Sequence, residues 1–89
     1  MSKPTSPKPE SFANSKERDY WHMAQDTAFR AGASLVYEDG STWLFFGEEK
    51  QLIVQASHPD YIWFETWRAL HHRYEGLSRL WVGGRPLPP

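Results

Sequence analysis

The alternation of apolar and polar residues is most informative over residues 34–56, where short apolar runs are separated by polar turn residues. Asp39-Gly40 favours a type I′ turn, because both central positions of that turn need a positive φ. Such a turn pairs Leu35 with Leu44. The segment 47–50 is polar and contains glycine, which predicts a second hairpin. The stretch therefore predicts a three-stranded antiparallel meander.

The side chains of this meander fall into two sets, because successive residues of a strand point to opposite faces. One set is Val36, Trp43, Phe45, Leu52, Val54 and Ala56, and the other is Leu35, Tyr37, Thr42, Leu44, Phe46 and Ile53. A symmetric second loop pairs Phe46 with Gln51 and Leu44 with Ile53. Both faces are largely apolar, whereas a solvated face would be polar. Either a helix covers each face, or one face meets another molecule.

A helix is predicted before the meander, over residues 15–31. Asn14 can act as its N-cap, Glu17 has the spacing of a capping box, and Gly32 can follow its last turn. Its apolar stripe consists of an aromatic residue and small residues, which allow a close approach to a sheet: Trp21, Ala24, Ala28 and Ala31.

A second helix is predicted after the meander, over residues 58–74, with Gly76 closing it. Ser57 and Asp60 have the spacing of a capping box. Its stripe is heavily aromatic: Trp63, Trp67, Leu70 and Tyr74. We expect this stripe to pack on the sheet face that carries Trp43, Phe45 and Val54.

These elements predict an α+β fold in the order helix, three-stranded antiparallel β-meander and helix. Residues 14–82 form one domain, residues 1–13 are a flexible tail rich in proline, and residues 83–89 are a flexible tail rich in glycine and proline. Two alternatives are open for the apolar segment 80–82: it forms a short strand at a sheet edge, or it folds over the second helix.

Composition narrows the classes of function. The chain has 89 residues and no cysteine, so disulfides, cysteine-bound zinc and thiol nucleophiles are excluded, and the expected location is the cytoplasm. The formal net charge is −1, and Lys and Arg do not cluster as nucleic-acid binding usually requires. No apolar run approaches the roughly 18 residues of a membrane span.

Catalytic and metal-binding chemistry is not indicated by the spacing of polar residues. His71 and His72 are adjacent on a helix, so they do not converge on one metal ion. The serines lie at expected turn, cap and strand-end positions, and the acidic pairs Glu38-Asp39 and Glu48-Glu49 lie at opposite ends of the meander. We therefore expect no enzymatic activity, no cofactor and no metal.

A protein partner, or a second copy of the chain, is the expected ligand, because interfaces favour aromatic residues and arginine. The candidate contacts are Tyr37, Leu44 and Phe46 if the first helix leaves them uncovered, and otherwise Tyr61, Arg68 and His72. The alternative function is single-stranded nucleic-acid binding, with bases stacked on Tyr37 and Phe46. A third interpretation is that every aromatic residue serves the core.

In its size, lack of cysteine and lack of a catalytic set, the chain resembles small proteins of phages and mobile elements that inhibit host defences, such as anti-CRISPR proteins. The resemblance is one of type and rests on no motif. It implies a non-catalytic inhibitor that acts by steric occlusion of a host protein complex.

Overall fold

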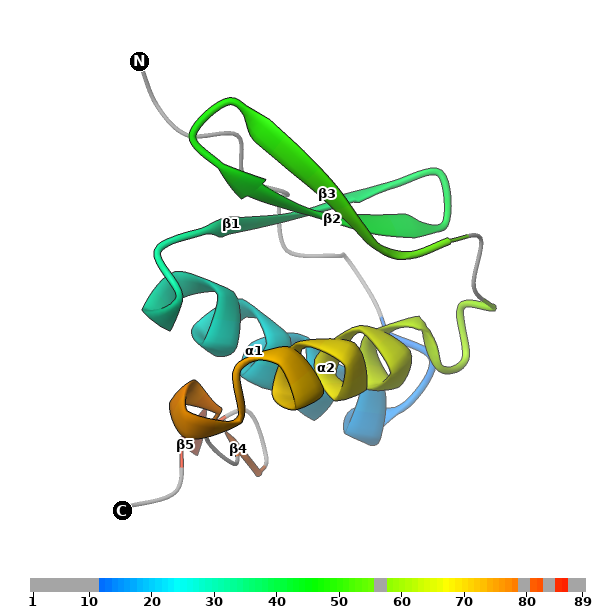
Figure 1. The fold of residues 1–89 in the computed structure, drawn as a ribbon. Helices are drawn as coiled ribbons and strands as arrows, with labels where there is room; N and C mark the ends of the chain where they lie inside the picture. Colours follow the sequence, from blue (N-terminus) through cyan, green and yellow to red (C-terminus); the bar gives the residue numbers. More distant parts are fainter. Residues whose placement is uncertain (1–11, 56–57, 79–80, 83–84, 87–89) are drawn as a thin grey trace.

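The structure, a computed structural model, describes residues 12–55, 58–78, 81–82 and 85–86. Its elements are α1 (Ser15–Arg30), β1 (Ser34–Glu38), β2 (Ser41–Phe46), β3 (Glu49–Val54), α2 (Ile62–Arg73), the 3-10 helix η1 (Glu75–Leu77), β4 (Trp81–Val82) and β5 (Arg85–Pro86). The first three strands form one antiparallel sheet, and both α-helices lie on one side of it (Figure 1). The predicted α+β class and element order are confirmed.

Helix α1 is bounded by the caps that the sequence predicts. The side-chain oxygen Oδ1 of Asn14 accepts a hydrogen bond from the backbone N–H of Glu17 at 2.9 Å. At the other end Gly32 has a φ of +79°, and the N–H of Ala33 donates to the carbonyl of Ala28 at 2.9 Å. This bond belongs to a Schellman C-cap, which ends the helix and directs the chain into β1.

The first hairpin has the predicted turn and the predicted register. Asp39 and Gly40 have φ values of +51° and +77°, as a type I′ turn requires. The strands β1 and β2 then pair as expected, with Leu35 opposite Leu44.

The second hairpin is shorter than predicted, so its predicted register is wrong. Its turn contains only Gly47 and Glu48, and Phe46 lies opposite Glu49, two residues earlier than expected. Gly47 has a φ of +62°, which suits the first central position of a type II′ turn. Glu49 and Lys50 are exposed strand residues rather than loop residues, and exposed strand positions accept polar side chains.

A β-bulge in β3 also changes which side chains share a face. Trp43 pairs with Leu52, whereas the adjacent Thr42 pairs with Val54, so Ile53 is the extra residue. Val54 thereby joins the side of Thr42 and packs against the core. The prediction that Val54 shares a face with Trp43 is wrong, because simple alternation fails where a strand contains an extra residue.

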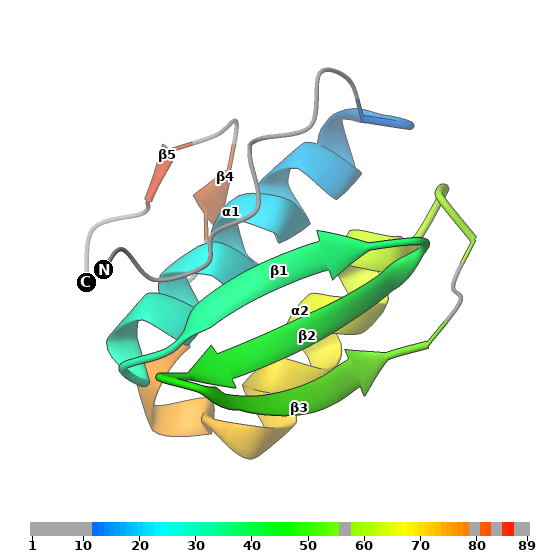
Figure 2. The ribbon, with the colours of Figure 1, turned by 90° about the horizontal axis from the view of Figure 1, so that it is seen from above.

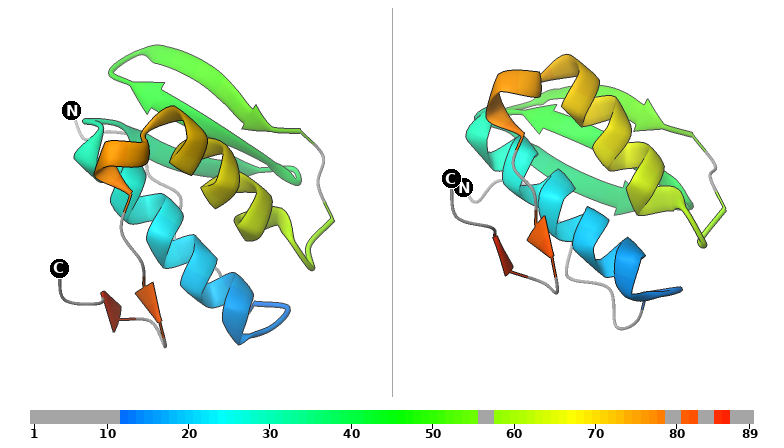
Figure 3. Two further views of the ribbon diagram at one scale, coloured as in Figure 1. Left: turned by 60° about the horizontal axis from the view of Figure 1, so that its bottom comes forward. Right: turned by 90° about the horizontal axis from the view of Figure 1, so that it is seen from below.

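The two helices run side by side in the same direction under a single face of the sheet (Figure 3). Seen from the opposite side, the sheet lies in front of both helices (Figure 2). The predicted packing of the second helix on Trp43 and Phe45 is therefore wrong. The covered face instead presents the compact side chains of Leu35, Thr42 and Leu44, which are at most 1% exposed.

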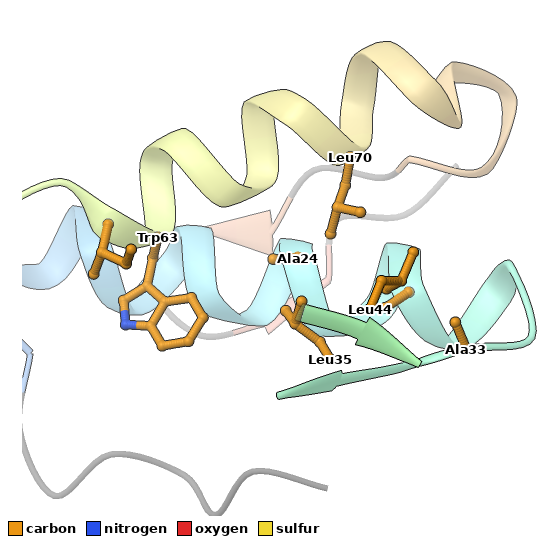
Figure 4. Close-up of a cluster of buried hydrophobic side chains, with 8 residues drawn as sticks. Ala24, Ala33, Leu35, Leu44, Trp63 and Leu70 are labelled. Carbon is orange, nitrogen blue, oxygen red and sulfur yellow. The ribbon is translucent and has the colours of Figure 1, made fainter. Parts of the chain in front are cut away.

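The hydrophobic core lies between this face and the two helices (Figure 4). Its members are Ala24, Ala28, Ala33, Leu35, Leu44, Ile62, Trp63 and Leu70. The predicted stripes are confirmed for Ala24 and Ala28 of α1 and for Trp63 and Leu70 of α2, whereas Ala31 is only partly buried and lies outside the core cluster. Trp21, Trp67 and Tyr74 are partly buried around this core.

Helix α2 begins at Ile62, four residues later than the predicted start at His58. Residues 58–61 form a turn, in which the N–H of Tyr61 donates to the carbonyl of His58 at 3.1 Å. Tyr61 occupies the N-cap position but makes no side-chain capping bond. Ser57, the predicted cap, lies outside the described residues.

A short C-terminal strand is present, but it does not extend the meander. β4 pairs only with β5, in a separate two-stranded sheet that contacts α1. Of the predicted tail at 83–89 only Arg85 and Pro86 are described, and the predicted tail at 1–13 is described only at Phe12 and Ala13. The ring of Phe12 packs 6.0 Å from that of Trp21.

Candidate functional site

The sheet residues predicted to contact a partner lie on the face that the helices cover. Leu44 is 0% exposed, and Phe46 packs against the edge of the core. Tyr37 is 39% exposed, and its ring centroid lies 5.5 Å from that of Trp63. Leu44 therefore serves the core, whereas Tyr37 and Phe46 keep part of their surface exposed, and their role in binding stays a prediction.

The second set of predicted contacts lies on α2 and at the end of the turn that precedes it. Tyr61, Arg68 and His72 are all exposed. Tyr61 stacks on His58, with 5.3 Å between the ring centroids. From the sequence, these three residues are proposed as contacts in the event that the sheet residues are covered. Because the helices do cover that face of the sheet, the three residues remain candidates, and their role in binding stays a prediction.

The opposite face of the sheet is not covered by any described helix or strand. We call it the open face, and it consists of Val36, Trp43, Phe45, Lys50 and Leu52. Trp43 lies in the middle of the sheet, between Val36 on β1 and Leu52 on β3, and Phe45 lies opposite Lys50. Leu52 is 40% exposed, and the two aromatic side chains are partly exposed.

Lys50 lies over the aromatic part of the open face. Its ammonium nitrogen Nζ is 4.0 Å from the centroid of the Trp43 ring and 5.8 Å from that of Phe45. Such a cation–π contact at an exposed site contributes about 0.5–1 kcal/mol. It holds a positive charge at the centre of an apolar surface.

Exposed carboxylates lie at both ends of the open face. Glu38 and Asp39 stand at the first turn, and Glu48 stands in the second, whereas Glu49 begins β3 opposite Phe46, on the side of the helices. These turns are at opposite ends of the sheet, as predicted from the sequence. The open face thus combines apolar side chains, the cation of Lys50 and carboxylates at both ends.

The sequence pattern placed most residues of the open face in one set, but the contact surface was predicted on the other face. Both sets of side chains are apolar, so composition alone did not distinguish the covered face from the open one. The charges of β3 did not distinguish them either, because Lys50 lies opposite Phe45 on the open face and Glu49 lies opposite Phe46 on the covered face.

A pocket of about 440 Å³ lies where the end of β1, the β3–α2 connection and the residues before α1 meet. We call it the aromatic pocket, and its lining consists of Phe12, Ala13, Tyr37, Pro59, Asp60, Ile62 and Trp63. Three of these residues are aromatic, and Asp60 supplies the carboxylate. The sequence did not reveal it, because its walls come from three separate segments.

A buried carboxylate joins the two helices close to this pocket. Glu17 of α1 is 2% exposed, and its oxygens accept hydrogen bonds from the backbone N–H groups of Trp63 and Phe64, each at 3.0 Å. Glu17 therefore caps α2, where a negative charge also opposes the positive end of the helix dipole. The predicted capping box within α1 is wrong for this side chain.

The electrostatic surroundings of Glu17 are acidic. Burial raises the pKa of Glu17 above its usual value of 4.5, and the carboxylates of Asp60 and Glu65 raise the pKa further. The hydrogen bonds from Trp63 and Phe64 lower the pKa, but they do not outweigh the desolvation. The region beside the aromatic pocket thus carries a negative potential.

Metal-binding and membrane-spanning features are absent from the part of the chain that the structure describes. No three His, Cys, Asp or Glu side chains there gather as metal ligands would. The rings of His71 and His72 lie 6.4 Å apart at 59° to each other. Among the same residues, no helix has the length and apolar character needed to cross a bilayer.

Comparisons of the chain with protein-family models, curated proteins and solved structures find no match.

Proposed function

We propose that this protein is a non-catalytic binding module that docks a protein partner on its open face. The observation that carries the proposal is the placement of both helices on one side of a sheet that is apolar on both sides. Trp43, Phe45 and Leu52 remain partly exposed as a result. Trp and Phe are enriched at protein interfaces, where they supply much of the binding free energy.

The charges around the open face define the chemistry of the partner. The carboxylates at its two ends would attract basic groups, and its centre would bury apolar ones. We therefore infer a partner surface with an apolar centre and Lys or Arg on either side of it. Binding there would block the partner's own surface, which is the steric occlusion expected of a small inhibitor of a host complex.

Single-stranded nucleic acid is a weaker candidate for the same face. Trp43 and Phe45 beside Lys50 resemble a platform on which bases stack. The carboxylates at both ends would repel the phosphates that continue along the strand. Tyr37 and Phe46, the residues first considered for stacking, are turned toward the helices.

The proposal is tested by site-specific photo-crosslinking in the host cell. A photoreactive phenylalanine analogue is placed at Phe45, and a matched control carries it at Phe29, which is 80% exposed on the helix layer. We expect a protein adduct from position 45 that position 29 does not give. The adduct protein is then purified and its affinity for Phe45→Ser and Phe29→Ser variants is measured by calorimetry.

The expected result is at least about a tenfold loss of affinity in Phe45→Ser, with Phe29→Ser unchanged and both variants folded by circular dichroism. Equal affinities of the two variants would contradict the proposal. Oligonucleotide binding at low salt that Phe45→Ser abolishes would assign the face to nucleic acid instead. An adduct with the chain itself would identify a homodimer, which light scattering can verify.

A further inference from the structure

The aromatic pocket lies apart from the open face and is not needed for the proposed docking. Its rings belong to a connected group, in which Tyr37 lies 5.5 Å from Trp63, Trp63 lies 6.5 Å from Trp21, and Trp21 lies 6.0 Å from Phe12. Tyr37 keeps 39% of its surface exposed, so part of its ring is available to a ligand. The pocket thus offers aromatic walls that are partly open to solvent.

Asp60 gives this pocket its charge. Its side chain is 65% exposed, and its ion-pair partner among the described residues is His58, whose Nδ1 lies 3.6 Å from Oδ2 and is charged only when protonated. Asp60 does not cap α2, because the carboxylate of Glu17 already accepts the N–H groups there. The Asp60 carboxylate is therefore available to a cation in the pocket.

The groups behind the pocket reinforce this preference. Glu17 accepts hydrogen bonds from the backbone of α2. The two charged neighbours that raise its pKa, Asp60 and Glu65, are both acidic. A neutral or anionic ligand would gain nothing from this potential. A cationic ligand would gain both from the carboxylates and from the negative faces of the aromatic rings.

We propose that the aromatic pocket binds the guanidinium group of an arginine side chain in a peptide or protein, between its aromatic walls and the carboxylate of Asp60. A guanidinium is planar, so it can stack on an aromatic ring while its N–H groups donate to both oxygens of a carboxylate. A pocket of about 440 Å³ also has room for the aliphatic stem, which Pro59 and Ile62 would contact. An ammonium group lacks the planar fork and would gain less.

The proposal is tested by two-dimensional ¹H–¹⁵N NMR of the full chain at pH 7.5. The probes are the N-acetyl, N-methylamide derivatives of arginine, of lysine and of citrulline, which has nearly the shape of arginine but no charge. We expect arginine to give saturable shifts at the amides of Asp60 and Tyr37 and at the indole N–H of Trp63. Citrulline should give no saturable shift, and lysine should bind at least about threefold more weakly than arginine.

Two variants, each of which removes one negative charge, test where arginine binds. Asp60→Asn should lower the affinity for arginine at least about fivefold, whereas Glu48→Gln, at the far end of the sheet, should leave it unchanged. Any one of four results would overturn the proposal. These are equal binding of arginine and citrulline, equal effects of the two variants, binding of lysine as strong as that of arginine, and chemical shift changes confined to other regions. Phe45→Ser should keep the arginine response, so failure here and failure of the open-face proposal are distinguishable.

Discussion

Glu17 joins the two helices of this small domain through one buried side chain. A single carboxylate satisfies two N–H groups at the start of α2, a helix whose own N-cap residue offers no side-chain acceptor. A helix end left without such partners is costly when it is buried. Glu17 therefore determines how the two parallel helices are joined at their N-terminal ends.

Replacing Glu17 by Ala should lower the free energy of unfolding by about 2 kcal/mol, because two N–H groups at a buried helix end lose their acceptor. Glu17→Gln should cost less, since its amide oxygen still accepts a hydrogen bond. Urea denaturation of the three proteins measures the difference. Glu48→Ala, in an exposed turn, is the control and should stay within about 0.5 kcal/mol of the wild type.

The pH dependence of stability tests the ionisation of Glu17. Because its pKa is raised above 4.5, the folded chain holds this proton more tightly than the unfolded chain does. The stability that Glu17 contributes is thus fully present below about pH 4.5 and is lost as the pH rises through the folded pKa. The unfolding free energy of the wild type minus that of Glu17→Gln should therefore fall as the pH rises above about 4.5. A difference that increases over this range would contradict the raised pKa.

At the scale of elements, a buried pair of hydroxyl groups connects β2 to α2. Thr42 and Thr66 are 0% exposed, and their Oγ1 atoms lie 3.0 Å apart. The hydroxyl of Thr66 donates to the carbonyl of Ile62 at 2.7 Å, so it accepts the proton of Thr42. The two elements therefore meet through a polar contact in which every hydroxyl proton has an acceptor.

Replacing Thr66 by Val should destabilise the fold by about 1–2 kcal/mol, because the hydroxyl of Thr42 then has no acceptor. The double variant Thr42→Val, Thr66→Val removes both polar groups and should recover part of that loss. A double-mutant cycle measured by urea denaturation gives the coupling energy. Strictly additive losses would show that the two hydroxyl groups stabilise the fold independently.

The whole molecule depends on one shared core, because α1, α2 and the sheet all contribute to the same cluster. Leu70 is 0% exposed, and Leu70→Ala should cost about 3 kcal/mol. Phe29→Ala, at a side chain that is 80% exposed, should cost less than about 0.5 kcal/mol. Unfolding followed by far-ultraviolet circular dichroism and by tryptophan fluorescence should give coincident transitions for both variants. Separate transitions would mean that the helices and the sheet unfold independently.

The aromatic content of the chain is divided between two tasks at this scale. Trp63 serves the core, and Trp43 and Phe45 remain on the open face. The interpretation in which every aromatic residue serves the core does not fit the placement of these two rings. A covered face, an open face and a separate pocket thus arise from one short chain.

The sequence by itself determined the features that act over a few residues. Asn14 and Gly32 mark the two ends of α1, and Asp39-Gly40 determines the first turn and its register. Both can be predicted because a cap or a type I′ turn depends on local backbone geometry. The amphipathic periods then identified the strands and part of the helical core, namely Ala24, Ala28, Trp63 and Leu70, but not Ile62. The proposed contact Leu44 is buried instead, because alternation sorts side chains into two sets without saying which set is covered.

Only the tertiary structure decided which set the helices cover. That choice depends on how two helices and a bulged sheet fill space together, and the extra residue Ile53 had no local signature. The same is true of Glu17, whose partner Trp63 is 46 residues away. Interactions between distant segments are selected by packing and by the need to satisfy buried polar groups, and these conditions exist only once the chain is folded.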